Sequence, residues 1–337
     1  MTRRAHEIDL FLAGSGWHDA KKHALAGDAS NRRYLRLSKG AQSAVLMDAP
    51  PSFGEDVRPF VRIANWLRQA GFSAPEIYYA DEAQGFLLLE DLGDDLIARV
   101  VEADDRQEQS LYGIATDVLA ELHATPAPDL IRYTPDMMAD MIAPVFDWYL
   151  MGCGQDGTVK NEFMGRFRGI LDKYCSETDV VILRDYHAEN LLWLPSRTGV
   201  AGVGLLDFQD ALLGHRAYDL VSLLHDIRRD VSQETEQNMI RRYLDRTGLE
   251  QTSFEAAFHA LGVQRNLRIM GVFTRLCLYA GKPHYIDYLP RVWRLILREL
   301  EHPALDSIRQ MALDHLPEPT PALIRKLKNQ CATIPTP

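Results

Sequence analysis

The chain has 337 residues, 46% hydrophobic and 25% charged, which is ordinary for globular proteins and enough for two domains or one large bilobal unit. Its 47 acidic and 37 basic side chains give a formal net charge of −10, which argues against a nucleic-acid-binding surface because phosphate binding needs clustered Lys and Arg. Without an apolar run of about 18 residues, a signal peptide or zinc-like cysteine spacing, we expect a cytoplasmic protein with free thiols and no membrane partner.

The first hundred residues predict a small mixed lobe in which strands surround one helix. A turn cluster at residues 27–31 separates two segments that are predicted to pair as strands, and residues 43–46 should form the next strand. Between residues 60 and 67 the apolar side chains recur at i, i+3, i+4 and i+7, which predicts an amphipathic helix. The apolar run at residues 87–89 predicts a buried strand that ends in an acidic segment at Glu90.

From about residue 95 the sequence predicts a mainly helical lobe, because apolar side chains recur at helical spacing. Helices are expected at residues 111–122, 136–151, 162–174, 217–227, 254–279 and 290–301, with one short strand at residues 180–183. We therefore divide the chain into an N-terminal lobe of residues 1–93 and a C-terminal lobe of residues 94–337.

Three polar residues lie in the most informative stretch of the chain. Asp185 is followed five residues later by Asn190 and, after seventeen more, by Asp207. The apolar runs at residues 191–194 and 203–206 flank a turn cluster and predict a hairpin, which would place Asn190 beside Asp207. The spacing matches the kinase pattern R-D-x-x-x-x-N followed by D-F. We predict that Asp185 is the catalytic base and that Asn190 and Asp207 bind Mg²⁺ during phosphoryl transfer from ATP. The alternative is a surface hairpin whose acids are only solvated.

Residues 183–190, 205–210 and 214–220 resemble the aminoglycoside phosphotransferase and choline kinase family, which shows H-G-D-x-H-x-x-N and then I-D-F-x-D-x-x-x-G-x-P-A-Y-D-L. The resemblance implies an α+β, protein-kinase-like bilobal fold with a small β-rich N-lobe and a larger, mainly helical C-lobe. It also implies ATP and Mg²⁺ as cofactors. Leu183 stands where the family usually has His, and Arg184 where it usually has Gly. These departures argue against a standard antibiotic-resistance enzyme.

A narrower resemblance lies in residues 27–34, 45–51, 183–187 and 207–211, which are similar to the branch containing bacterial N-acetylmuramate/N-acetylglucosamine anomeric kinases. Enzymes of that branch phosphorylate the C1 hydroxyl of amino sugars recovered from the cell wall. The resemblance implies a small amino-sugar substrate, whereas the sequence gives neither the sugar nor the oligomeric state.

The N-lobe of a kinase holds the nucleotide with a turn over the phosphates and a strand end beside the adenine. We therefore predict nucleotide contacts from Ser30, Asn31 and Arg33, and from backbone groups at Glu90 and Leu92. The predicted turn has one Gly instead of a Gly-rich run, so its pattern alone would equally fit an ordinary surface hairpin.

The phosphate-binding Lys that protein kinases carry on their third strand has no counterpart here, because Met47 occupies the corresponding position. Arg32, Arg33 and Arg36 precede it in the chain and are the candidate replacements. The sequence does not choose among them, since the period-2 alternation of a strand aims them at different faces.

The acceptor hydroxyl is predicted to lie near Asp185, surrounded by polar side chains of the helical lobe. The candidate substrate residues are Arg184, His187, Asp210 and Arg265. His187 would either stabilise the charge of the transferred phosphate or have a structural role in the loop, and Arg184 would otherwise anchor the loop. Residues 264–266 would otherwise form a solvated helix face. Asp219 is expected either to cap a helix or to bond the backbone of the catalytic loop.

Three functions remain open from the sequence. The leading interpretation is an ATP- and Mg²⁺-dependent kinase of an amino sugar. The second is a kinase of another alcohol, such as an aminoglycoside or a choline-like compound. The third is a nucleotide-binding pseudokinase that scaffolds a partner, which Met47 favours and the intact Asp185, Asn190 and Asp207 disfavour.

Overall fold

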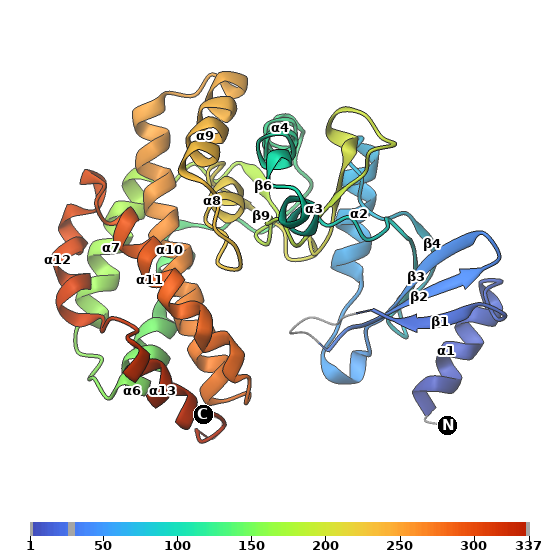
Figure 1. The fold of residues 1–337 in the computed structure, drawn as a ribbon, viewed down its shortest axis with the longest axis horizontal. Helices are drawn as coiled ribbons and strands as arrows, with labels where there is room; N and C mark the ends of the chain where they lie inside the picture. Colours follow the sequence, from blue (N-terminus) through green and yellow to red (C-terminus); the bar gives the residue numbers. More distant parts are fainter. Residues whose placement is uncertain (1–2, 26–30, 335–337) are drawn as a thin grey trace. The chain divides into compact units, whose positions relative to one another are not determined.

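The computed structural model describes residues 3–25 and 31–334, which divide into two compact units (Figure 1). The first unit comprises Met1–Val118 and Ala188–Ala211, and the second comprises Leu119–His187 and Leu212–Pro337. The chain therefore passes from one unit to the other after Val118, His187 and Ala211. The lobe boundary that we placed after residue 93 stays a prediction.

An antiparallel sheet of five strands, in the order β1-β2-β3-β5-β4, forms the core of the first unit. Its strands are β1 (Lys21–Ala24), β2 (Arg33–Lys39), β3 (Gln42–Asp48), β4 (Ile77–Asp81) and β5 (Phe86–Glu90). The predicted pairing on either side of residues 27–31 is confirmed, since β1 pairs with β2. β5 lies between β3 and β4 and is buried from Phe86 to Leu89, which explains why its sequence is apolar without alternation.

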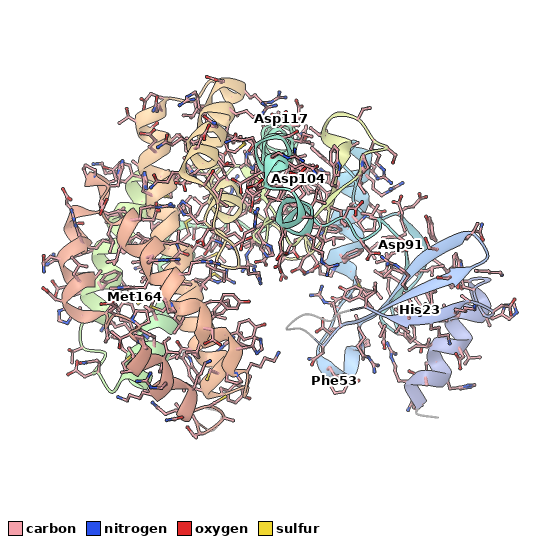
Figure 2. The ribbon with its side chains drawn as sticks, in the orientation of Figure 1. His23, Phe53, Asp91, Asp104, Asp117 and Met164 are labelled. Carbon is pink, nitrogen blue, oxygen red and sulfur yellow. The ribbon has the colours of Figure 1, made fainter. Side chains whose placement is uncertain are left out.

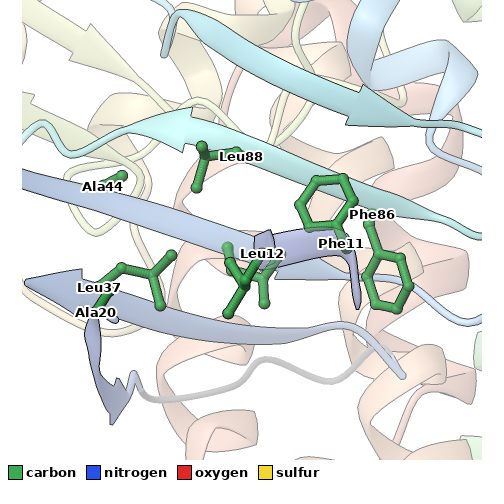
Figure 3. Close-up of a cluster of buried hydrophobic side chains, with 8 residues drawn as sticks. Phe11, Leu12, Ala20, Leu37, Ala44, Phe86 and Leu88 are labelled. Carbon is green, nitrogen blue, oxygen red and sulfur yellow. The ribbon is translucent and has the colours of Figure 1, made fainter. Parts of the chain in front are cut away.

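Helix α1 (Arg3–Gly14) packs against this sheet through Phe11 and Leu12, and the ring of Phe11 lies 5.2 Å from that of Phe86 (Figure 3). Burying each such side chain contributes about 1.5–3 kcal/mol. A partly buried ion pair adds to this contact, because Arg4 lies 2.7 Å from the buried Asp48 and 3.8 Å from the centre of the Phe86 ring. Helix α1 was not predicted from apolar periodicity, since charged residues interrupt its apolar stripe.

Helix α2 (Arg58–Gln69) was predicted from its periodicity, and the four apolar residues that define the period are the ones that it buries. They are Phe60, Ile63, Ala64 and Leu67. The helix ends two residues before Gly71, whose φ of +90° an L side chain rarely adopts. The ring of Phe60 stacks on Phe208 with 4.8 Å between centroids, which links α2 to the segment that carries Asp207.

The predicted hairpin after residue 190 also belongs to the first unit. Its strands β7 (Leu191–Trp193) and β8 (Val203–Leu205) are antiparallel. Bridges from Ser73 to Gly204 and from Leu96 to Leu192 join it to the rest of the unit. The remaining elements here are η1 (Pro51–Phe53), α3 (Ile97–Ala103), η2 (Asp105–Gln107), α4 (Glu108–Ala124, whose last residues belong to the second unit) and η4 (Gly199–Gly202).

The second unit is mainly helical, with one pair of strands, β6 (Val180–Ile182) and β9 (Leu212–Gly214). Its helices are α5 (Pro135–Asp140), η3 (Val145–Leu150), α6 (Met151–Cys153), α7 (Lys160–Tyr174), α8 (Tyr218–Leu224), α9 (Gln233–Thr247), α10 (Gln251–Leu278), η5 (Pro283–Tyr288), α11 (Leu289–Glu299), η6 (Pro303–Leu305), α12 (Asp306–His315) and α13 (Pro321–Asn329). Helix α10 contacts α7, α8, α11 and α13 (Figure 1). Residues 260–267 of α10 are all buried, and eight residues span more than two turns, so the helix is enclosed on every side.

The helix predicted over residues 136–151 is interrupted after Asp140, and α5 is followed by a separate π-helical segment, η3. Pro144 stands at this break, where it lacks the N–H that a continuous helix would need. Gly271 of α10 faces the same point, and a Cβ built on it would lie 2.2 Å from the Pro144 carbonyl carbon. Only Gly therefore permits α10 and η3 to approach this closely.

Three of the four cysteines are buried, and all four are free thiols as predicted. Among residues 3–25 and 31–334, the structure contains no helix whose length and apolar character would let it cross a bilayer.

Candidate functional site

The hairpin β7–β8 presents Asn190 and Asp207 at its open end. The ladder pairs Leu191 with Leu205, and the backbone N–H of Leu206 then donates to the Asn190 carbonyl at 3.0 Å. Asp207 is the next residue along the chain, so the hairpin brings Asn190 and Asp207 side by side, as the sequence predicted.

Asp207 has a φ of +56°, in the left-handed region that Asp and Asn enter more readily than other residues apart from Gly. The side-chain amide of Gln209 donates to Asp207 Oδ1 at 2.7 Å and orients the carboxylate. Gln209 stands where the D-F-G motif has Gly, so the departure from that motif adds a hydrogen bond. Sequence reasoning did not assign Gln209 this contact.

Asn190 and Asp207 both line a cavity of about 260 Å³ whose lining residues all belong to the first unit. Its walls are largely apolar and include Val45, Met47 and Leu192. At 260 Å³ the cavity lies slightly below the usual size of small-molecule sites, about 300–1,000 Å³. Apolar walls that include an amide and a carboxylate suit a flat, uncharged group joined to a metal-bound anion.

The carboxylate of Asp207 and the amide oxygen of Asn190 are hard oxygen donors of the kind that Mg²⁺ prefers. Mg²⁺ usually takes one or two protein ligands and completes its shell with waters and phosphate oxygens. Within the described part of the chain, no group of three His, Cys, Asp or Glu side chains is placed to hold a metal. The two oxygen donors of Asn190 and Asp207 fit a Mg²⁺ ion that would complete its shell with waters and phosphate oxygens.

Residues 90–93 line the cavity where the chain leaves β5, and the adenine contacts of Glu90 and Leu92 stay a prediction. The backbone N–H of Glu90 is already engaged in the sheet, since it donates to the Glu76 carbonyl at 2.7 Å. Its carboxylate accepts from Arg197 at 2.5 Å and lies 3.5 Å from Arg68. Glu90 thus anchors the start of this segment, and Asp91, Leu92 and Gly93 after it also line the cavity.

Asp91, labelled in Figure 2, is held by Arg36, whose Nε lies 2.9 Å from its carboxylate. The same guanidinium pairs with Asp94 at 2.6 Å and donates to the Gly93 carbonyl at 3.1 Å. Arg36 is therefore a clamp on the segment after β5. Neither this clamp nor the Arg197–Glu90 pair had a local signal in the sequence, because each joins residues more than fifty positions apart.

The residues predicted to cover the phosphates have different positions. Ser30 lies outside the described residues. The backbone N–H of Asn31 donates to Glu55 at 3.1 Å, and its side-chain amide donates to the carbonyl of Phe53, which is labelled in Figure 2, at 3.4 Å. Arg33 is largely exposed and pairs with the buried Asp48 at 2.6 Å.

In the second unit, the loop that carries Asp185 is fixed by Asp219 of α8. The buried Asp219 carboxylate accepts from the backbone N–H groups of Leu183 at 2.5 Å and Arg184 at 2.9 Å. Burial raises the pKa of Asp219 to about 7, against the opposing effect of these two hydrogen bonds. Of the two roles expected for Asp219, bonding to the loop backbone is the one confirmed.

Arg184 has a φ of +72°, which explains why the family it resembles usually has Gly at this position. Its carbonyl accepts from Arg265 Nη1 at 3.1 Å and from the Ser222 hydroxyl at 3.3 Å. Together with the bond from its N–H to Asp219, these contacts hold the peptide groups directly before Asp185. Arg265 therefore has a positioning contact, while a contact to substrate stays a prediction for it and for Arg184.

His187 is buried, and Arg228 Nη1 lies 3.2 Å from its Nε2. A guanidinium only donates hydrogen bonds, so this imidazole nitrogen is the acceptor. Burial, helped by Arg228 and Arg265, holds the pKa of His187 well below its usual range. His187 is thus uncharged near neutral pH, which favours the structural role over charge stabilisation. Asp210, the remaining substrate candidate, is exposed in the first unit.

The expectation of a solvated face at residues 264–266 is wrong, because all three side chains are buried. Gln264 donates to Tyr133 Oη at 2.8 Å and to the Met138 carbonyl at 2.9 Å. Hydrogen bonds offset the cost of burying Gln264 and Arg265, whereas neither side-chain polar atom of Asn266 has a hydrogen-bond partner among the described residues.

The fold and the motifs agree with the comparisons with known proteins. Residues 23–254 match the model of the phosphotransferase enzyme family, and the chain belongs to that family. It is therefore a phosphotransferase, and both the resemblance and the kinase-like fold class are confirmed.

Two curated relatives are both named N-acetylmuramate/N-acetylglucosamine kinase. The protein from Caulobacter vibrioides is 40% identical over 89% of this chain and 93% of its own length. That from Pseudomonas aeruginosa is 33% identical over 86% of this chain and 87% of its own. A choline/ethanolamine kinase family protein from Mesorhizobium loti shares the fold, with a TM-score of 0.62 and 14% identity over 96% of this chain and 99% of that one.

Proposed function

We propose that this phosphotransferase transfers the γ-phosphate of Mg²⁺-ATP to an amino sugar, at the anomeric hydroxyl of N-acetylmuramate or N-acetylglucosamine. The observation that carries the nucleotide part is the cavity whose lining runs from residues 90–93 to Asn190 and Asp207. Its apolar walls suit adenine, and its polar end suits metal-bound phosphates. The choice of an amino sugar as acceptor is supported by the two curated relatives, because both are named for these two amino sugars.

Asn190 and Asp207 would hold Mg²⁺, which neutralises charge on the phosphates. Gln209 keeps the Asp207 carboxylate oriented through its 2.7 Å hydrogen bond. Backbone groups after Glu90 would bond the adenine, and the Arg36 clamp on Asp91 fixes where those groups point. Binding and orientation of the nucleotide thus fall to the first unit.

Asp185 is assigned the role of base from its place in the D-x-x-x-x-N pattern. It would accept the proton of the sugar hydroxyl as the oxygen attacks phosphorus. The peptide groups before it are held by Asp219, Arg265 and Ser222, so the base is positioned by a rigid backbone. Such positioning, combined with charge neutralisation, provides most of the catalysis in phosphoryl transfer.

The proposal is tested by measuring ADP release from Mg²⁺-ATP with N-acetylmuramate, N-acetylglucosamine, other hexosamines, aminoglycosides and choline, with phosphorus NMR on each product. We expect turnover on an N-acetyl sugar and an anomeric phosphate signal. An Asp185→Asn preparation made in parallel controls for contaminating kinases. A product phosphorylated at another hydroxyl would overturn the anomeric assignment. Turnover restricted to an aminoglycoside or to choline would overturn the amino-sugar assignment.

A further inference from the structure

The position that carries the phosphate-binding Lys in protein kinases is apolar in this chain. Met47 lines the nucleotide cavity and is almost wholly buried. A thioether carries no charge, so a cation for the phosphates has to come from elsewhere. The candidates along the chain are Arg32, Arg33 and Arg36, and their contacts in the first unit differ.

Arg33 and Arg36 are each committed to other structures. Arg33 lies opposite Asp48 in the sheet register and pairs with it at 2.6 Å, and Asp48 is also the carboxylate that Arg4 of α1 binds. Arg36 is fixed to Asp91, Asp94 and the Gly93 carbonyl beyond β5. The contacts of Asp48 secure α1. The contacts of Arg36 secure the segment after β5, which we assign to the adenine.

Arg32 points toward the metal-binding end. Its side chain is 16% exposed, and its Nη1 lies 4.0 Å from Asp207 Oδ1. Its Nε donates to Glu55 at 3.0 Å, and Glu55 also accepts the backbone N–H of Asn31 at 3.1 Å. Glu55 therefore holds two consecutive residues and fixes the guanidinium from one side while its other side faces Asp207.

Burial by itself would lower the pKa of the Arg32 guanidinium, but nearby Tyr34, Glu55 and Asp207 raise it above its ordinary value. The group is consequently charged at every relevant pH. The 4.0 Å separation from Asp207 is the outer limit of an ion pair, so the two groups attract each other without the short contact of a direct hydrogen bond.

We infer that Arg32, held by Glu55, is the phosphate-binding cation of this enzyme and takes the place of the lysine–glutamate pair of protein kinases. The inference rests on the proposed function, because it assigns a residue to the phosphates of the bound nucleotide. A guanidinium offers two parallel N–H donors to two phosphate oxygens, whereas a lysine offers a point charge. The cation comes from the residue before β2, while the third strand contributes only an apolar wall.

The test is calorimetric binding of adenosine, Mg²⁺-ADP and Mg²⁺-AMP-PNP to the wild type and to Arg32→Met. Adenosine contacts the apolar part of the site and should bind both proteins within about twofold. Mg²⁺-AMP-PNP should bind Arg32→Met about 10- to 100-fold more weakly, the range of a lost charge-assisted hydrogen bond. Equal affinities of both proteins for AMP-PNP would overturn the inference, and so would a loss found in Arg33→Met instead. A wild type that binds no nucleotide would instead contradict the proposed function.

Two further variants separate a phosphate role from a structural one. Arg58→Met is the matched control, since it removes a positive charge of the same unit from an exposed pair with Asp56 that lies outside the cavity. It should change none of the affinities. Arg32→Lys keeps the positive charge but loses the two parallel N–H donors of the guanidinium. Its loss of affinity should be smaller than that of Arg32→Met, and larger for Mg²⁺-AMP-PNP than for Mg²⁺-ADP. If Arg32→Met does not fold, Arg32→Lys is the test in its place. The inference would be contradicted if Arg32→Lys bound adenosine more weakly than the wild type does, while the gain in affinity from adenosine to Mg²⁺-AMP-PNP stayed the same.

Discussion

The carboxylate of Asp219 accepts a hydrogen bond of 2.9 Å from the backbone N–H of Arg184, a residue whose φ of +72° is unfavourable for any side chain. The unfavourable conformation persists because both sides of the residue are held, by Asp219 at its N–H and by Arg265 and Ser222 at its carbonyl. Backbone of this kind is typical of functional sites, where the surrounding structure enforces it.

The first prediction compares two substitutions of Arg184 that remove the same side chain. Arg184→Gly should be more stable than Arg184→Ala by up to about 1 kcal/mol, because only Gly adopts a positive φ freely. Urea unfolding of both variants measures the difference. Equal midpoints would show that the loop relaxes to another conformation when the arginine is lost.

The second prediction concerns the pH dependence of stability. The pKa of Asp219 is raised from 3.8 in the unfolded chain to about 7 in the folded protein, which corresponds to about 4 kcal/mol. The folded state thus binds the proton more tightly between these pH values. The stabilisation is complete below about pH 4 and is lost as the pH rises toward 7.

Asp219→Asn cannot titrate, so its free energy of unfolding should depend less on pH than that of the wild type. The wild type should lose stability relative to the variant between pH 4 and pH 7, even if Asn lowers stability overall. Chemical unfolding at four or five pH values measures the two curves. Parallel curves would rule out titration of Asp219 over this interval.

The third prediction tests the catalytic base. Asp185→Asn should lower kcat by about 10²- to 10⁴-fold, the usual contribution of a general base. The affinity for Mg²⁺-ADP should stay within a few-fold of wild type, because Asp185 is not among the residues that line the nucleotide cavity. Full activity in the variant would require another base.

The fourth prediction concerns the metal ligands. Asp207→Ala should bind ADP equally well with and without Mg²⁺, whereas the wild type should bind it more tightly with Mg²⁺. Gln209→Ala removes only the 2.7 Å bond to Asp207 and should weaken the Mg²⁺ effect by about 10- to 100-fold. ADP titrations at graded Mg²⁺ concentrations distinguish the variants, and an unchanged Mg²⁺ effect in Asp207→Ala would refute the assignment.

The fifth prediction concerns the N-terminal helix. Arg4→Met breaks a 2.7 Å ion pair with the buried Asp48 and should cost about 1–3 kcal/mol, because Asp48 keeps Arg33 as a partner. Arg58→Met breaks an exposed pair and should cost clearly less stability than Arg4→Met. Thermal unfolding of both variants measures the contrast, and equal costs would mean that the Arg4–Asp48 pair does not secure α1.

Features with a local pattern were predictable from the sequence. Helix α2 follows from a four-residue apolar period, and the hairpin β7–β8 follows from two apolar runs around a turn cluster. Both patterns are complete within about twenty residues, so no tertiary information was needed. Helix α1 was missed because its apolar contacts are few and charged residues separate them.

Features that depend on distant contacts were not predictable. The three arginines near β2 have similar local sequences, and only Glu55, Asp48 and Asp91 distinguish their roles. The polar residues 264–266 indicated a surface, but the helices around α10 enclose them. In each case the deciding partner lies elsewhere in the chain, beyond the reach of periodicity or spacing.

The substitution of Met47 for lysine also has a consequence for how catalytic competence is recognised among related sequences. A survey that requires a lysine on the third strand would classify this chain as inactive, although Asp185, Asn190 and Asp207 are all present in its sequence. If the charge comes from Arg32, the better criterion is a pair of residues, an arginine directly before the second strand and an acid after the third. Such a criterion looks for the phosphate-binding cation itself and not for a residue at one strand position. It would distinguish chains in which the cation lies at another position from chains that have no such cation.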